Sequence, residues 1–139
     1  MKQFLSFLIF SFGGVVTSRL FGVWNGNMTT LAIFCLLDFA TGLLLAFAFK
    51  KSTKTKSGKL SSSECVKGIT RKVIIFVIIC VAYRVQLILA ITYLRDGVVI
   101  GFIVSEGISI LENTGRMGIK SELLEKALDN VKQKGGLTK

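Results

Sequence analysis

Composition and charge place this chain of 139 residues among membrane proteins. Hydrophobic residues make up 51% of it, eleven residues are Phe and none is Pro, and the apolar residues gather in long blocks. The net charge of +10 comes without a nucleic-acid-binding motif, so it indicates membrane topology and anionic headgroups, not nucleic acid. His is absent, which removes the commonest general base and argues against an enzyme. The three cysteines lack CxxC spacing, so we expect neither a disulfide framework nor a metal site, and no cofactor.

The first apolar block, residues 4–24, is long enough to span a bilayer but is interrupted. Gly13 and Gly14 break it, and Arg19 would have to reach outward to the interface. We predict a membrane span here. An interfacial helix and a cleaved signal peptide are the alternatives.

Three further blocks are predicted to cross the membrane, at residues 28–49, 73–94 and 98–115. A turn signal at residues 25–27 precedes them, and the polar turn Arg95-Asp96-Gly97 separates the last two. The predicted fold class is therefore an all-α integral membrane protein with four transmembrane helices.

Residues 50–72 are polar and basic, in contrast to the apolar blocks on either side. Glu64 is their only acidic residue, and Ser, Thr and Gly separate many basic ones. Insertion keeps Lys and Arg loops on the cytoplasmic side, so we predict a cytoplasmic loop and both termini on that side, with a specific lipid site as the alternative. The basic residues are Lys50, Lys51, Lys54, Lys56, Lys59, Lys67, Arg71 and Lys72.

The chain divides into a transmembrane bundle, residues 1–115, and a cytoplasmic tail, residues 116–139, predicted to form an amphipathic helix. Ser121 is the expected N-cap, and Gly135 and Gly136 are expected to end the helix. The apolar face could dock on the bundle, on another copy or on the membrane surface. It contains Ile119, Leu123, Leu124, Ala127, Leu128 and Val131.

Four ionisable residues inside the predicted spans are the candidate functional residues. Asp38, Arg84 and Glu106 fall near the middle of their blocks, and Glu112 lies toward the cytoplasmic end of the last one. A charge at this depth costs on the order of 2.5–3.5 kcal/mol on insertion scales and usually faces a partner or water. One hypothesis places Arg84 between Asp38 and Glu106 as a latch within one subunit; the other places these residues on the lumen of an assembly.

Small residues recur at helical spacing on two predicted spans. Gly101, Ser105 and Ser109 follow one another at four-residue intervals, and Gly42 precedes Ala46 by the same interval. Such faces let membrane helices approach closely, either between copies or in ordinary packing within one chain.

Several segments resemble the toxin-secretion/phage-lysis holin family. They are Leu37 to Gly42 (LDFATG), Val66 to Gly68, Glu106 to Asn113 (EGISILEN) and the tail segment Leu123 to Leu128. The resemblance covers most of the chain. The stretch from Glu106 to Asn113 is its most specific part, because hydropathy alone does not explain its acidic and amide positions.

The resemblance implies a holin: a protein that homo-oligomerises in the bacterial cytoplasmic membrane and opens lesions for a protein cargo. The cargo would be a phage endolysin or, in some bacteria, a secreted toxin, and the partners would be lipids, further copies and that cargo. A non-permeabilising scaffold or antiholin-like regulator is the alternative. A small ion channel is less well supported, because the chain lacks a recognisable inverted repeat.

Overall fold

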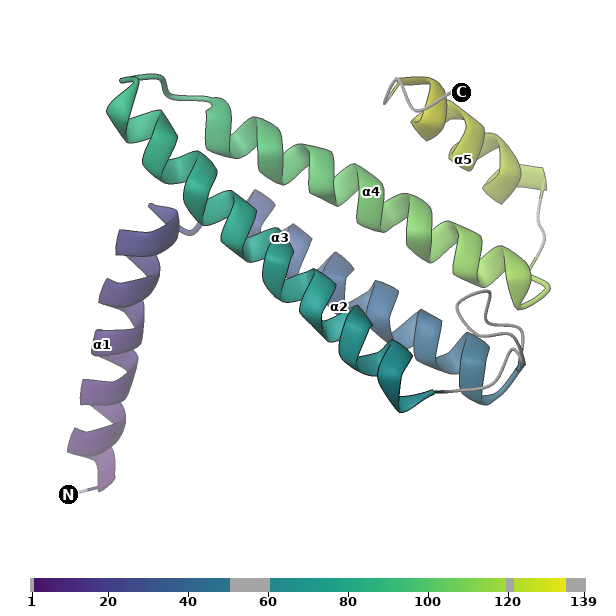
Figure 1. Ribbon diagram of the computed structural model, residues 1–139, viewed down its shortest axis with the longest axis horizontal. Coiled ribbons are helices and arrows are strands. Elements are labelled where there is room, and N and C mark those ends of the chain that lie inside the picture. Colours follow the sequence, from purple (N-terminus) through teal and green to yellow (C-terminus); the bar gives the residue numbers. More distant parts are fainter. Residues whose placement is uncertain (1, 51–60, 120–121, 135–139) are drawn as a thin grey trace.

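The computed structural model describes residues 2–50, 61–119 and 122–134, and every regular element in these ranges is an α-helix (Figure 1). The all-α prediction is therefore confirmed for this part of the chain. The helices are α1 (Lys2–Phe21), α2 (Gly26–Phe47), α3 (Ser62–Ile88), α4 (Leu94–Arg116) and α5 (Glu122–Lys134).

Helices α2, α3 and α4 form the central bundle. α2 packs most extensively against α4 and runs in the same direction, as the neighbouring pairs Phe34–Gly107 and Thr41–Asn113 show. α3 runs antiparallel to both (Figure 1). α1 stands at an angle and meets α3 near its own C-terminal end, while α5 lies beside α4.

The connection between α1 and α2 is short and defined by local chemistry. Gly22 adopts a left-handed conformation with φ of +74°, which L side chains rarely adopt. The Asn25 side chain then accepts a hydrogen bond from the Met28 backbone N–H at 3.1 Å and caps α2. The predicted turn therefore lies slightly earlier, and Gly26 already begins the helix.

α3 begins inside the segment predicted to be a basic loop. The expected boundary at residue 72 is wrong, because residues 62–72 are helical. Ser61 occupies the N-cap position and Glu64 is the third helical residue, the S-x-x-E pattern that favours a helix start. Glu64 also pairs with Lys67 at 2.7 Å.

The turn predicted at Arg95-Asp96-Gly97 is also misplaced, since these residues form the first turn of α4. The chain instead reverses between Ile88 and Leu94, where Ala90 has a φ of +53°. Two features favour an early helix start. Asp96 complements the positive end of the helix dipole, and the Gln86 side chain accepts a hydrogen bond from the Arg95 backbone N–H at 2.9 Å.

The bundle differs from a water-soluble protein in its exposed apolar surface and in its buried charged residues. The bundle has a small apolar core, but Asp38, Arg95, Glu106 and Asn113 are buried as well. Large aliphatic and aromatic side chains cover the outside of α2 and α3, as expected of a surface that faces lipid. The core consists of Met28, Leu31, Cys35, Ile75, Ile79 and Val99, and the outward residues include Ile33, Leu36, Leu44, Phe47, Val73, Val77 and Val81.

Within the described residues, α2 is the one helix both long enough and apolar enough to cross a bilayer. Its 22 residues extend about 33 Å. α3 is longer, but charged residues such as Lys67, Arg71 and Arg84 interrupt its apolar sequence. The four-span topology therefore stays a prediction.

Candidate functional site

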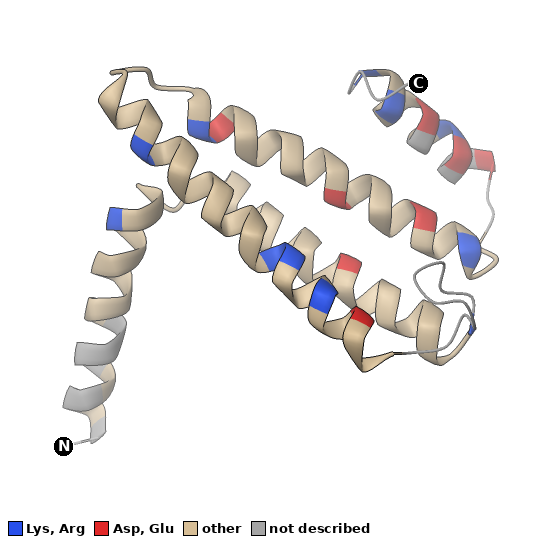
Figure 2. Ribbon diagram, viewed as in Figure 1, with Lys and Arg blue, Asp and Glu red and all other residues tan. Residues whose placement is uncertain are grey.

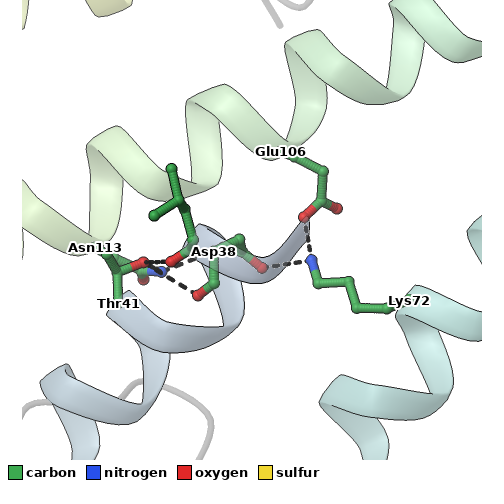
Figure 3. A network of polar contacts seen from close by, with 6 residues as sticks. Asp38, Thr41, Lys72, Glu106 and Asn113 are labelled. Carbon is green, nitrogen blue, oxygen red and sulfur yellow. Dashed lines mark hydrogen bonds and ion pairs between the residues drawn. The ribbon is translucent and has the colours of Figure 1, made fainter. Parts of the chain in front are cut away.

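A network of ion pairs and hydrogen bonds joins the three central helices (Figure 3). The Lys72 ammonium of α3 donates to Asp38 Oδ2 of α2 at 2.6 Å and also to a carboxylate oxygen of Glu106 on α4. Asn113 of α4 donates from Nδ2 to Asp38 Oδ1 at 3.3 Å and to Thr41 Oγ1 at 3.2 Å. One cation thus links two helices to a third. We call these five residues the buried polar network.

The network is closed to its surroundings. Only 1% of the Glu106 side chain and 8% of the Asp38 side chain are exposed, and Lys72 is 14% exposed. Among the described residues, every buried side-chain nitrogen or oxygen has a hydrogen-bond partner. A buried ion pair is weak evidence for stability in itself, but removing one member costs roughly 3–5 kcal/mol because it leaves a charge uncompensated.

Helical spacing brings the network residues onto facing surfaces. Asp38 and Thr41 are three residues apart on α2, and Glu106 and Asn113 are seven apart on α4, so each pair occupies one side of its helix. Lys72 approaches from the antiparallel α3.

Two glycines let the helices come close at this level. A methyl group on Gly107 would lie 3.3 Å from the Phe34 ring, and one on Gly68 would lie 3.4 Å from the Phe39 ring. The Gly107 distance is tight for a carbon contact and the Gly68 distance is at the lower edge of ordinary contact, so a larger residue at position 107 would press α4 away from α2.

The cation of the network is Lys72 and not Arg84, which corrects the expected pairing. Arg84 is exposed and makes no ion pair with any residue in the described ranges. It lies about 18 Å farther along α3 than Lys72, since each helical residue advances the chain by 1.5 Å. Sequence reasoning placed Lys72 in a loop and so excluded it. The S-x-x-E helix start before it was the signal that could have corrected this.

Asn113 and Thr41 were not predicted as site residues. Both belong to segments that carry the family resemblance, and both share a helical side with a buried carboxylate. Polar residues at intervals of three and seven from an intramembrane acid are the signal that could have identified them.

Glu112 lies outside the network. Its side chain is 40% exposed and pairs with Lys132 of α5 at 3.1 Å, so it connects the tail helix to α4. On the predicted apolar face of the tail, Ile119 and Ala127 are exposed and Val131 is half-buried. Ser121, Gly135, Gly136 and the side chains of Leu123, Leu124 and Leu128 lie outside the described residues.

The predicted small-residue faces have different surroundings. A methyl group on Gly42 would lie 3.9 Å from the Asn113 amide nitrogen, so Gly42 lies against α4, and Ala46 is buried. Gly101 faces open space, whereas Ser105 and Ser109 are half-buried.

The predicted basic loop is only partly described. Lys67 and Arg71 are exposed on α3, and Lys50 follows the end of α2. Figure 2 shows the basic positions in the first half of α3 and the acidic positions on α2 and α4. Lys51, Lys54, Lys56 and Lys59 lie outside the described residues.

A second buried cation, not predicted, anchors α1. Arg95 is 8% exposed, and its Nη1 donates to the backbone carbonyls of Phe21 at 2.8 Å and Val23 at 3.0 Å. The Arg95 Nε and Nη2 groups also donate hydrogen bonds to Asp96 Oδ1, at 2.9 Å and 2.6 Å. A cation at the carbonyl end of a helix is favoured by the helix dipole. The Phe21 ring packs edge-on against Phe76 nearby.

Apolar outer faces around a closed set of charges, on the helices that the structure describes, form the pattern expected of a helical protein in lipid. Residues 15–133 match the bacteriophage holin family, and the chain belongs to this family. Holins are membrane proteins of the cytoplasmic membrane and are not enzymes.

Three relatives cover nearly the whole chain. An uncharacterised protein of Clostridium perfringens strain 13 is 33% identical over 129 residues, which are 91% of this chain and 90% of the relative. An uncharacterised protein of Listeria monocytogenes is 35% identical over 121 residues, or 86% and 80%. An uncharacterised 14.9 kDa protein in the nagH 3′ region of Clostridium perfringens is 33% identical over 124 residues, or 87% and 88%. No solved structure matches the chain.

Proposed function

We propose that this protein is a working holin, which assembles with further copies in the bacterial cytoplasmic membrane and forms lesions that pass an endolysin or another protein cargo. The buried polar network carries this proposal. Both of its carboxylates pair with the Lys72 ammonium within one chain and the outer face of α2 is apolar, so single copies can insert in lipid with these three groups shielded from it.

The network suits a protein with two states. In lipid, separating Lys72 from Asp38 and Glu106 would expose charges at about 2.5–3.5 kcal/mol each on insertion scales, so the closed bundle is favoured. Contact with water removes most of the cost of separating these charges, because water solvates the ammonium and the carboxylates. Association of copies that admits water would therefore shift the population toward an open arrangement.

The proposed topology has four spans and both termini in the cytoplasm. The end of α2 and the start of α3 lie together with the end of α4 (Figure 1). This end carries the exposed Lys67 and the basic sequence from Lys50 onward, and the positive-inside rule assigns such an end to the cytoplasm.

A non-permeabilising scaffold or antiholin-like regulator is the second candidate. The observation that favours it is that the network is complete within one chain and needs no partner copy for its ion pairs. Such a protein would keep the closed bundle permanently.

Induced expression in bacteria distinguishes these functions, with a membrane-potential dye and release of a cytosolic reporter enzyme followed together. Abrupt depolarisation after a delay, accompanied by reporter release, supports the holin. Depolarisation alone indicates a small channel, and no effect at confirmed membrane expression favours the scaffold or antiholin.

Asp38→Asn tests the network in the same assay. The substitution leaves Lys72 with Glu106 alone, so we expect the delay before depolarisation to change at equal expression. Lys126→Gln is the matched control, because it breaks an exposed pair with Glu122 on α5. The same delay in both variants would exclude Asp38 from the mechanism.

A further inference from the structure

Two neighbouring basic residues of α3 face different surroundings. Lys72 points into the bundle, whereas Arg71 is exposed and makes no ion pair with any residue that the structure describes. Arg71 continues an exposed polar row along the first half of α3. We call this row the α3 polar stripe; it consists of Ser63, Lys67, Thr70 and Arg71. Steps of four and three residues keep it on one side of the helix.

Contacts with α2 fix the depth of this stripe. Lys72 bonds to Asp38, and Gly68 lies against the Phe39 ring, so residues 68–72 of α3 lie beside the middle of α2. About 13 Å of helix separates Asp38 from the end of α2 at Phe47. If α2 spans the membrane, Arg71 therefore lies well inside the hydrocarbon layer.

An exposed guanidinium is unfavourable at that depth when lipid surrounds it. Lys67 lies nearer the end of the bundle and pairs with Glu64, so it can reach the interface or remain neutralised. Arg71 lies about 6 Å deeper along α3, and the distance to the end of α2 exceeds the length of its side chain.

The neighbouring surface of α2 is different in kind. Leu36, Leu37, Leu44 and Phe47 are exposed there without any charge among them, as expected of a wall against lipid. The outer face of α2 thus suits acyl chains, whereas the α3 polar stripe offers hydroxyl and charged groups to water beside the exposed apolar residues Val66, Ile69 and Val73.

We propose that the α3 polar stripe lines the aqueous lumen when copies assemble, and that Arg71 makes the smallest lesions prefer anions. This inference rests on the proposed holin function. A ring of unpaired guanidinium groups attracts anions and repels cations in a narrow pore, whereas Glu64 offsets the charge of Lys67. Thr70 adds a hydroxyl group to this surface. The hydroxyl donates its hydrogen bond to the Val66 carbonyl at 2.9 Å, and its oxygen can still accept one from water.

The first test is the reversal potential of purified full-length protein in planar bilayers under a KCl gradient, measured on the smallest conductance steps. We expect the unmodified chain to prefer chloride and Arg71→Glu to change the sign of the reversal potential. Lys126→Glu, which makes the same change of charge on α5, should leave the sign unchanged. Conductance with the same preference in all three proteins overturns the inference and leaves the holin function standing. Absence of any conductance contradicts the holin function itself.

The second test is labelling of Thr70→Cys by a membrane-impermeant maleimide, in a parent protein with Cys65→Ala and Cys80→Ala and with the buried Cys35 retained. In inside-out vesicles, we expect labelling to rise only after depolarisation is triggered. Leu36→Cys, on the apolar outer face of α2, should stay unlabelled before and after the trigger. Complete labelling of Thr70→Cys before triggering would place the stripe in the cytoplasm and overturn the inference.

Discussion

Replacing Lys72 with Met removes the cation that joins the three central helices while keeping a side chain of similar length. The Asp38 and Glu106 carboxylates would then be buried without the ammonium group that pairs with both, since only 8% and 1% of their side chains are exposed. Breaking a buried pair in this way costs roughly 3–5 kcal/mol. Because each 1.4 kcal/mol is a factor of ten, the ratio of closed bundle to opened or unfolded protein should fall by roughly a hundredfold to a few thousandfold.

The assay is the free energy of unfolding, measured by titration with sodium dodecyl sulfate in detergent micelles and followed by circular dichroism. Lys67→Met on the same helix is the control, because its exposed pair with Glu64 should contribute at most about 1 kcal/mol. Adding Asp38→Asn and Glu106→Gln to Lys72→Met should restore most of the loss, since neutral groups need no cation. Equal unfolding free energies for Lys72→Met and Lys67→Met would refute the reasoning.

Two further predictions concern the attachment of α1. Arg95→Ala removes two charge-assisted hydrogen bonds to the end of α1, worth roughly 1.5–3 kcal/mol each, and should broaden the distance distribution between spin labels on α1 and α3. Arg84→Ala, which removes an exposed arginine, should leave that distribution unchanged. Gly22→Ala should destabilise the protein by at least about 1–2 kcal/mol, because the residue is left-handed and the new methyl group would lie 2.7 Å from the Tyr83 ring. Gly13→Ala, a helical position with open space around it, should stabilise α1 by up to about 1 kcal/mol, and equal effects of the two substitutions in the unfolding titration would contradict this.

Apolar blocks and turn residues predicted the helical nature of the chain and the approximate position of α2. They failed at the start of α3, where a run of basic residues outweighed the helix-start pattern at Ser61 and Glu64. Lysine has a long apolar stem, so its side chain can enter a helix bundle where buried carboxylates pair with its ammonium group. A segment rich in basic residues is therefore not always a loop. Lys72 is such a case.

The sequence by itself determined that acids occur in the middle of apolar segments, and therefore that a partner or water is needed there, because hydrocarbon does not solvate charge. It could not identify the cation, because Lys72 was expected in a loop and Arg84 was the one cation inside the predicted span 73–94. The register of α3 against α2, with Gly68 beside the Phe39 ring and Lys72 beside Asp38, decided that. The same register turned Lys72 inward and Arg71 outward, because residues one step apart on a helix point about 100° from each other.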